Sequence, residues 1–184
     1  MLADIYQVEQ VLSIDISNIA ELYNAFVESK IRIQYEERLN FQIEKAPDRY
    51  KVEHEAFYED HIKLSSSSLY ANNYTNEELI DKDKEMRIMK YGLIVSFKNG
   101  IPTFLHQSFA EFFLAKSFFQ KIQQTQDHNE FEEVLRDEEY FLIRKGTERI
   151  FFHFFELTVA NRDYASFVDL LTLNPNIYTF MQFG

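Results

Sequence analysis

The sequence predicts a mainly α-helical fold, a helical bundle that carries one two-stranded β-hairpin at about residues 93–106. Only 4 Gly and 3 Pro interrupt the 184 residues, a composition that favours long helices over many short strands. Apolar residues recur at the i, i+3, i+4 spacing of amphipathic helices along most of the chain. The 46% hydrophobic and 16% aromatic content is that of a globular protein with a sizeable buried core.

The hairpin is indicated by two short strand patterns that flank an Asn-Gly pair. Residues 93–97 are rich in β-branched and aromatic side chains, as a half-buried strand prefers. Asn99 and Gly100 both tolerate the positive φ that a type I′ turn demands. Pro102 follows the turn, so the second strand is expected to lie at an edge or to lack one ladder hydrogen bond.

His106 is expected where the second strand ends and a helix begins, because Phe109, Phe112 and Phe113 follow helical spacing. Two roles are open for a titratable side chain at such a junction. One is a histidine whose polar atoms are satisfied by backbone groups at the end of a buried strand. The other is a side chain that contacts a ligand lying across the hairpin. Glu111, about one helical turn further on, could orient the imidazole or belong to the polar face of the helix.

The rest of the chain divides into helical segments separated by short breaks. Pro47 suits the first turn of a helix, residues 75–78 form a capping box that opens a short helix, and Gly92 suits a helix stop. The four serines at residues 65–68 are expected to end the helix that Pro47 begins. Helices are predicted at about residues 1–12, 18–39, 47–64, 83–91, 109–122, 130–136, 138–161 and 163–173, with a short helical turn at 69–74.

Three regions follow from the order of these elements. Short helices followed by a two-stranded wing are the order of a winged-helix domain, which we assign to residues 46–122. Residues 1–45 are then a preceding helical segment. Two further amphipathic helices make residues 123–184 the start of a second helical domain.

Charge and residue usage exclude several functional classes. Nineteen basic and thirty acidic residues give 19 − 30 = −11, and this balance repels nucleic acid and anionic membrane surfaces. The absence of cysteine excludes disulfides and thiolate metal sites and fits a reducing compartment. No N-terminal signal peptide is visible, and apolar runs such as residues 150–155 are too short to span a bilayer. We therefore expect a soluble cytoplasmic protein that binds neither nucleic acid nor membrane.

No catalytic or metal-binding pattern is complete. Four scattered glycines cannot build a phosphate-binding loop, and no Ser-His-Asp or Cys-His arrangement has a supporting context. His54 and Glu55 begin a zinc-protease pattern in which Tyr58 replaces the second histidine, and His61 brings no third ligand. Residues 81–85 alternate carboxylates but lack the glycine and glutamate of a calcium loop. An enzyme is not expected, and neither catalytic residues nor metal ligands are predicted.

Residues 104–115, Phe-Leu-His-Gln-Ser-Phe-Ala-Glu-Phe-Phe-Leu-Ala, resemble the signature F-h-H-x-(S/T)-F-x-E-(F/Y)-h-A-A. That signature belongs to NACHT-type STAND NTPases, the class that contains the NOD-like receptors of innate immunity. The run Leu22–Lys30 is similar to the family's L-Y-x-x-F-(V/I)-x-x-K segment, and Met1–Tyr6 resembles a segment that follows a proline in the family. The resemblance implies that residues 1–45 end a first helical domain and that the ATPase core is missing from this chain. It also implies that His106 contacts the phosphate of bound ADP and holds the closed, inactive form.

The resemblance thus predicts a non-catalytic, autoinhibitory module that senses the nucleotide state of a neighbouring nucleotide-binding domain in a parent chain. ADP or ATP would bind only together with that domain, and the module alone would hold no cofactor. A stand-alone helical protein-interaction module is the alternative.

A winged-helix DNA binder is the second alternative, because five basic residues fall on the helix and wing that contact DNA in winged-helix regulators. Acidic residues interleave with these five and the whole chain is acidic, so pairing on the surface is the interpretation that the charge favours. The five residues are Lys82, Lys84, Arg87, Lys90 and Lys98.

Overall fold

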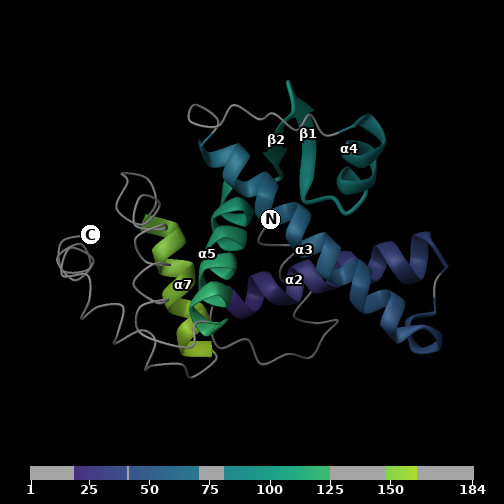
Figure 1. Cartoon of the computed structure of the whole chain (residues 1–184), viewed down its shortest axis with the longest axis horizontal. Coiled ribbons are helices and arrows are strands. Elements are labelled where there is room, and N and C mark those ends of the chain that lie inside the picture. Colours follow the sequence, from purple (N-terminus) through teal and green to yellow (C-terminus); the bar gives the residue numbers. More distant parts are fainter. Residues whose placement is uncertain (1–18, 41, 71–80, 125–147, 161–184) are drawn as a thin grey trace.

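The computed structural model describes residues 19–40, 42–70, 81–124 and 148–160 (Figure 1). These residues form a mainly helical fold with one two-stranded antiparallel sheet, which confirms the predicted fold class. In chain order the elements are α2 (Ile19–Ile33), a π-helical turn (Gln34–Arg38), a 3-10 turn (Ile43–Lys45), α3 (Pro47–Tyr70), α4 (Lys82–Met89), β1 (Ile94–Lys98), β2 (Ile101–Phe104), α5 (Gln107–Gln124) and α7 (Glu148–Ala160).

The hairpin forms at the predicted Asn-Gly turn. Asn99 and Gly100 adopt φ values of 54° and 77°, the two positive angles that let a type I′ turn join β1 to β2. Pro102 pairs with Phe97 in the antiparallel register. The sheet of the described residues consists of β1 and β2 alone, so Pro102 lies on an edge strand, where a missing amide proton is tolerated.

Helix α3 begins at Pro47 as predicted, but the prediction that the four serines end it is wrong. The helix continues through residues 65–68 to Tyr70. Ser65 turns its hydroxyl inward and donates to the backbone oxygen of His61 at 2.6 Å, one helical turn earlier. Leu64 and Ser65 are both buried, so packing of this face outweighs the weak helix propensity of serine.

The other predicted helices that lie in the described residues are present with shifted ends. The 18–39 prediction corresponds to α2 and its π-helical turn, and 83–91 corresponds to α4. Gly92 is the expected stop, with φ of 76° and its N–H bonded to the Met89 oxygen at 2.9 Å. The predictions at 1–12, 75–78, 130–136 and 163–173 lie outside the described residues, as do most of the turn at 69–74 and the first part of the 138–161 helix, of which the structure describes α7.

Helix α5 is the centre of the core. It lies between α3 and α7 in Figure 1 and packs against both, while α3 also packs against β2. Its buried side chains include Phe112 and Phe113, and one contiguous hydrophobic cluster runs from Ala20 on α2 to Leu157 on α7. The described parts of the three predicted regions therefore share this core, and the boundaries at residues 45 and 122 stay a prediction.

Among the described helices, none combines the length and the apolar character needed to cross a lipid bilayer.

Candidate functional site

His106 lies between the end of β2 and the first residue of α5, as the sequence predicted. The N–H of Leu105 donates to the Leu93 oxygen at 2.8 Å, and the N–H of Phe109 donates to the His106 oxygen at 3.1 Å. Leu105 is thus still bonded to the hairpin, and His106 is the first residue bonded to the helix. Its side chain is partly buried.

The imidazole of His106 caps the N-terminus of α5. Its Nδ1 accepts the backbone N–H of Ser108 at 3.2 Å, in the place where a serine or aspartate oxygen would usually cap a helix. The Ser108 hydroxyl oxygen lies 2.6 Å from the same Nδ1. Tyr23 on α2 donates its phenolic hydroxyl to that Ser108 oxygen.

These contacts fix which ring nitrogen of His106 carries the proton. A backbone N–H can only donate, so the Nδ1 that faces it must present a lone pair. The proton of the neutral imidazole therefore lies on Nε2, as assigned from the hydrogen-bond network. Nε2–H is a hydrogen-bond donor at the strand–helix junction.

Glu111, the predicted neighbour of His106, lies on α5 and is only 2% exposed. Its Oε1 accepts a hydrogen bond from the side-chain amide of Gln107 at 2.9 Å. Glu111 is thus a buried polar residue of α5, as is Ser108. A role for Glu111 in orienting His106 stays a prediction.

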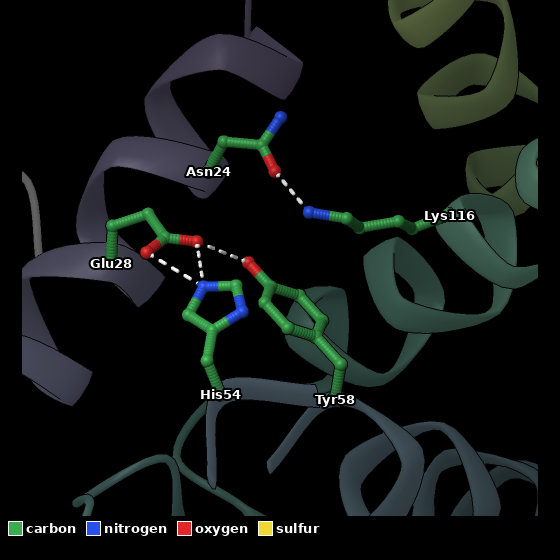
Figure 2. Close-up of polar contacts among 5 residues, drawn as sticks. All are labelled: Asn24, Glu28, His54, Tyr58 and Lys116. Atoms are coloured by element: carbon green, nitrogen blue, oxygen red, sulfur yellow. Dashed lines mark hydrogen bonds and ion pairs between the residues drawn. The ribbon is translucent and has the colours of Figure 1, made fainter. Parts of the chain in front are cut away.

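A second polar cluster lies where α2, α3 and α5 meet, and Figure 2 shows it. Both carboxylate oxygens of Glu28 on α2 lie within hydrogen-bonding distance of His54 Nε2, at 2.8 and 2.9 Å. Glu28 also accepts a hydrogen bond from the Tyr58 hydroxyl at 2.9 Å. Lys116 of α5 donates to the side-chain oxygen of Asn24 at 2.8 Å. The Lys116 ammonium also lies 4.0 Å from the centre of the Tyr58 ring.

The cluster sets the protonation of its members. Burial by itself would raise the pKa of Glu28, but hydrogen bonds from His54 and Tyr58 and the nearby charges of His54 and Lys116 hold that pKa below its usual value. Burial, reinforced by the Glu28 charge, raises the pKa of Tyr58, so its hydroxyl keeps its proton and donates. Burial lowers the pKa of Lys116 to about 8 although Glu28 opposes the shift. The arrangement is an ionised carboxylate held by fixed donors.

His54 and His61 have separate partners within the chain. His54 is engaged by Glu28, whereas His61 is fully buried and directs Nδ1 to the Phe57 backbone oxygen at 2.8 Å. The described residues contain no group of three or more side chains suited to holding a metal ion.

A hollow of about 440 Å³ opens beside the second cluster, between α2 and the N-terminal part of α3. Three carboxylates and one guanidinium line it, and Arg32 pairs with Glu36 at 2.9 Å. The lining residues are Ala25, Glu28, Ser29, Arg32, Glu36, Ile43, Glu44 and Tyr50.

The basic residues that suggested DNA binding are partly engaged within the chain. Lys84 forms an ion pair with Asp60 of α3 at 2.7 Å. Asp81 caps α4 by accepting the Lys84 backbone N–H at 2.8 Å. For Lys84, the pairing that the sequence favoured is confirmed.

Sequence reasoning missed the partners in both clusters. Tyr23 and Ser108 are 85 positions apart, and Glu28 and His54 are 26 apart on different helices, so no local spacing joins them. One signal was available, because Lys116 occupies a position in the otherwise apolar stripe of α5. A lysine in such a stripe indicates a buried partner.

In comparisons with known proteins, no protein-family model, curated protein or solved structure matches this chain.

Proposed function

We propose that the chain is a non-catalytic regulatory module of a NACHT-type STAND ATPase, in which His106 senses nucleotide bound to a neighbouring domain. In the closed state, Nε2–H of His106 donates to a phosphate oxygen of ADP held by that nucleotide-binding domain. Opening breaks this bond, so ADP favours the closed, inactive state over the open one. ADP or ATP is bound only when the two domains are together.

The observation that carries the proposal is the state of His106. Its Nδ1 is occupied by Ser108, which leaves Nε2–H as a donor on a partly exposed side chain. Phe104 before it and Phe109 after it are both buried, so the backbone on each side of His106 is anchored in the core. A donor on a rigid support loses little freedom when it binds an anionic oxygen.

Calorimetric titration of ADP tests the proposal. The titration uses the chain mixed with a purified nucleotide-binding domain of a NACHT-type STAND ATPase from the same source. We expect the mixture to bind ADP more tightly than the domain alone. His106→Ala should weaken that binding by roughly tenfold to a hundredfold, the worth of one hydrogen bond to a charged group. The isolated chain should bind ADP weakly or not at all.

Leu105→Ala is the matched control, because Leu105 is the exposed neighbour of His106 and carries no hydrogen-bonding side chain. It should leave the ADP affinity of the mixture unchanged. If His106→Ala lowers only the melting temperature and spares ADP affinity, His106 is a structural cap of α5 and the proposal fails.

The acidic hollow supports a second candidate function, a protein-interaction module. Its apolar surfaces from Ala25, Ile43 and Tyr50 lie among three carboxylates and one guanidinium, a net negative lining that suits a lysine or arginine side chain of a partner. Fluorescence anisotropy with a labelled arginine-containing peptide and its citrulline counterpart tests this function. Binding should require the positive charge and weaken with Glu44→Gln. Equal binding of the two peptides would exclude it.

A further inference from the structure

Three side chains from two distant segments form a chain of hydrogen bonds that ends at His106. Tyr23 of α2 donates to the Ser108 oxygen, and that oxygen lies 2.6 Å from Nδ1 of His106. The Ser108 backbone N–H approaches the same nitrogen at 3.2 Å. Ser108 is buried, so water does not compete freely for these groups.

Tyr23 is held in place by rings from two other helices. Its ring packs edge-on against Phe109 and stacks on Phe112, with centroid distances of 5.1 and 5.3 Å. His153 of α7 meets the same ring edge-on at 5.0 Å. The phenolic hydroxyl is therefore aimed at Ser108 by packing that does not depend on the hydrogen bond.

The direction of donation follows from the backbone N–H of Ser108, which can only donate and therefore needs a lone pair on Nδ1. The Ser108 hydroxyl then also donates to Nδ1, and its oxygen accepts from Tyr23. If Nδ1 carried a proton, it would face the Ser108 N–H, and two donors would meet with no acceptor between them. Both donors at Nδ1 thus favour the same tautomer of His106.

We propose that Tyr23 and Ser108 are positioning residues that hold His106 as a neutral imidazole protonated on Nε2, so that the site takes an anionic oxygen such as a phosphate oxygen. A metal ion is disfavoured, because one ring nitrogen is occupied and the other carries a proton. The phosphate part of the inference rests on the proposed function. The positioning part concerns this chain alone.

Nitrogen-15 NMR of the histidine ring tests the positioning in the whole chain at about pH 8.5, above the ordinary histidine pKa. The wild-type spectrum should show His106 with Nε2 protonated and with Nδ1 as a hydrogen-bonded acceptor. Tyr23→Phe keeps the ring packing and removes only the hydroxyl. It should move the Nδ1 signal toward that of an exposed histidine. Ser108→Ala should do the same. Ser108→Thr keeps a hydroxyl and should retain the wild-type signal.

Tyr35→Phe is the control, because it removes a partly buried phenolic hydroxyl that donates to Glu53 at 3.1 Å, away from His106. It should leave the His106 signals unchanged. A wild-type ring protonated on Nδ1, or a Tyr23→Phe spectrum identical to wild type at His106, overturns the positioning. A structural loss of folding cannot imitate the expected result, since it would move signals throughout the spectrum.

Two further measurements distinguish this inference from the proposed function. In the ADP titration with the nucleotide-binding domain, Tyr23→Phe should weaken binding by roughly fivefold, the worth of one neutral hydrogen bond. Adding Zn²⁺ to the chain alone should leave the His106 signals in place. If the tautomer is as expected but ADP binding ignores His106, the phosphate assignment fails. If ADP binding needs His106 but not Tyr23 or Ser108, the positioning fails and the proposed function stands.

Discussion

His54 and His61 lie on the same helix, α3, but in two chemically different regions. His54 is partly buried and shares the carboxylate of Glu28 with Tyr58. His61 is 0% exposed and lies against the Phe57 ring, with a centroid distance of 3.9 Å. One region is a set of charged and polar partners, and the other is an aromatic core that contains a histidine. The neighbours, more than the spacing along the helix, decide what each histidine does.

The largest difference between the two regions should appear when a ring beside each histidine is removed. Phe113 packs near His61 and is fully buried, so Phe113→Ala should lower the free energy of unfolding by about 3–5 kcal/mol. Tyr50 lies near His54 and is only partly buried. Tyr50→Ala should therefore cost much less. Urea unfolding of both variants provides the measurement, and equal losses would contradict the contrast.

The second-largest effect should be a loss of stability in acid, through His61. Burial lowers the pKa of His61 to about 4, although the Phe57 oxygen and Asp60 oppose the shift. An ordinary histidine has a pKa of about 6.5, so the unfolded chain binds this proton more readily than the folded chain. The contribution of neutral His61 to the free energy of unfolding is about 3 kcal/mol. This contribution is complete above about pH 6.5 and is lost as the pH falls toward about 4.

His61→Phe separates this loss from that of other groups, such as the carboxylate of Glu28, whose lowered pKa also makes folding weaker in acid. Urea unfolding of the variant between about pH 6.5 and 4 should show a flatter decline than wild type. An unchanged slope would mean that another group causes the acid sensitivity.

Removing the shared carboxylate should have a smaller effect on the His54 region. Glu28→Ala leaves the buried hydroxyl of Tyr58 without its acceptor, and we expect a loss of about 1–2 kcal/mol in unfolding free energy. Glu55→Ala is the matched control, because Glu55 is exposed and lies 4.0 Å from Lys51. Its loss should be near zero, as for most surface ion pairs. Equal losses would show that the Glu28 contacts add nothing to stability.

The smallest effect concerns the serine run beside His61. Ser65→Ala removes the hydroxyl that donates to the His61 backbone oxygen, but alanine suits a buried helical position better than serine. The unfolding free energy should change by less than about 0.5 kcal/mol. Circular dichroism should show the same helix content. A loss of helix would mean that the serine hydroxyls, more than packing, hold the end of α3.

The features that the sequence predicted well all rest on local rules. The Asn99-Gly100 turn follows from the ability of both residues to adopt positive φ. The stop at Gly92 and the start at Pro47 follow from the conformations that glycine and proline favour. The position of His106 at the junction follows from the change of apolar period between β2 and α5.

What sequence reasoning missed depends on tertiary packing and not on local sequence. The serines at 65–68 weaken an isolated helix, but α3 continues through them because buried neighbours such as Leu64 pack this face. For Glu111 the sequence left two roles open and gave no sign that the side chain is buried. Propensity acts over a few residues, whereas these outcomes depend on elements that lie far away in the sequence.

By itself, then, the sequence determined the mainly helical fold, the hairpin and the junction that holds His106. Only the tertiary structure decided what His106 and the other histidines contact. Tyr23 reaches Ser108, and Glu28 reaches His54, across helices whose relative placement is set by the packing of the core around α5. A side chain's tautomer and charge depend on those neighbours, because hydrogen bonds and burial act through space and not along the chain.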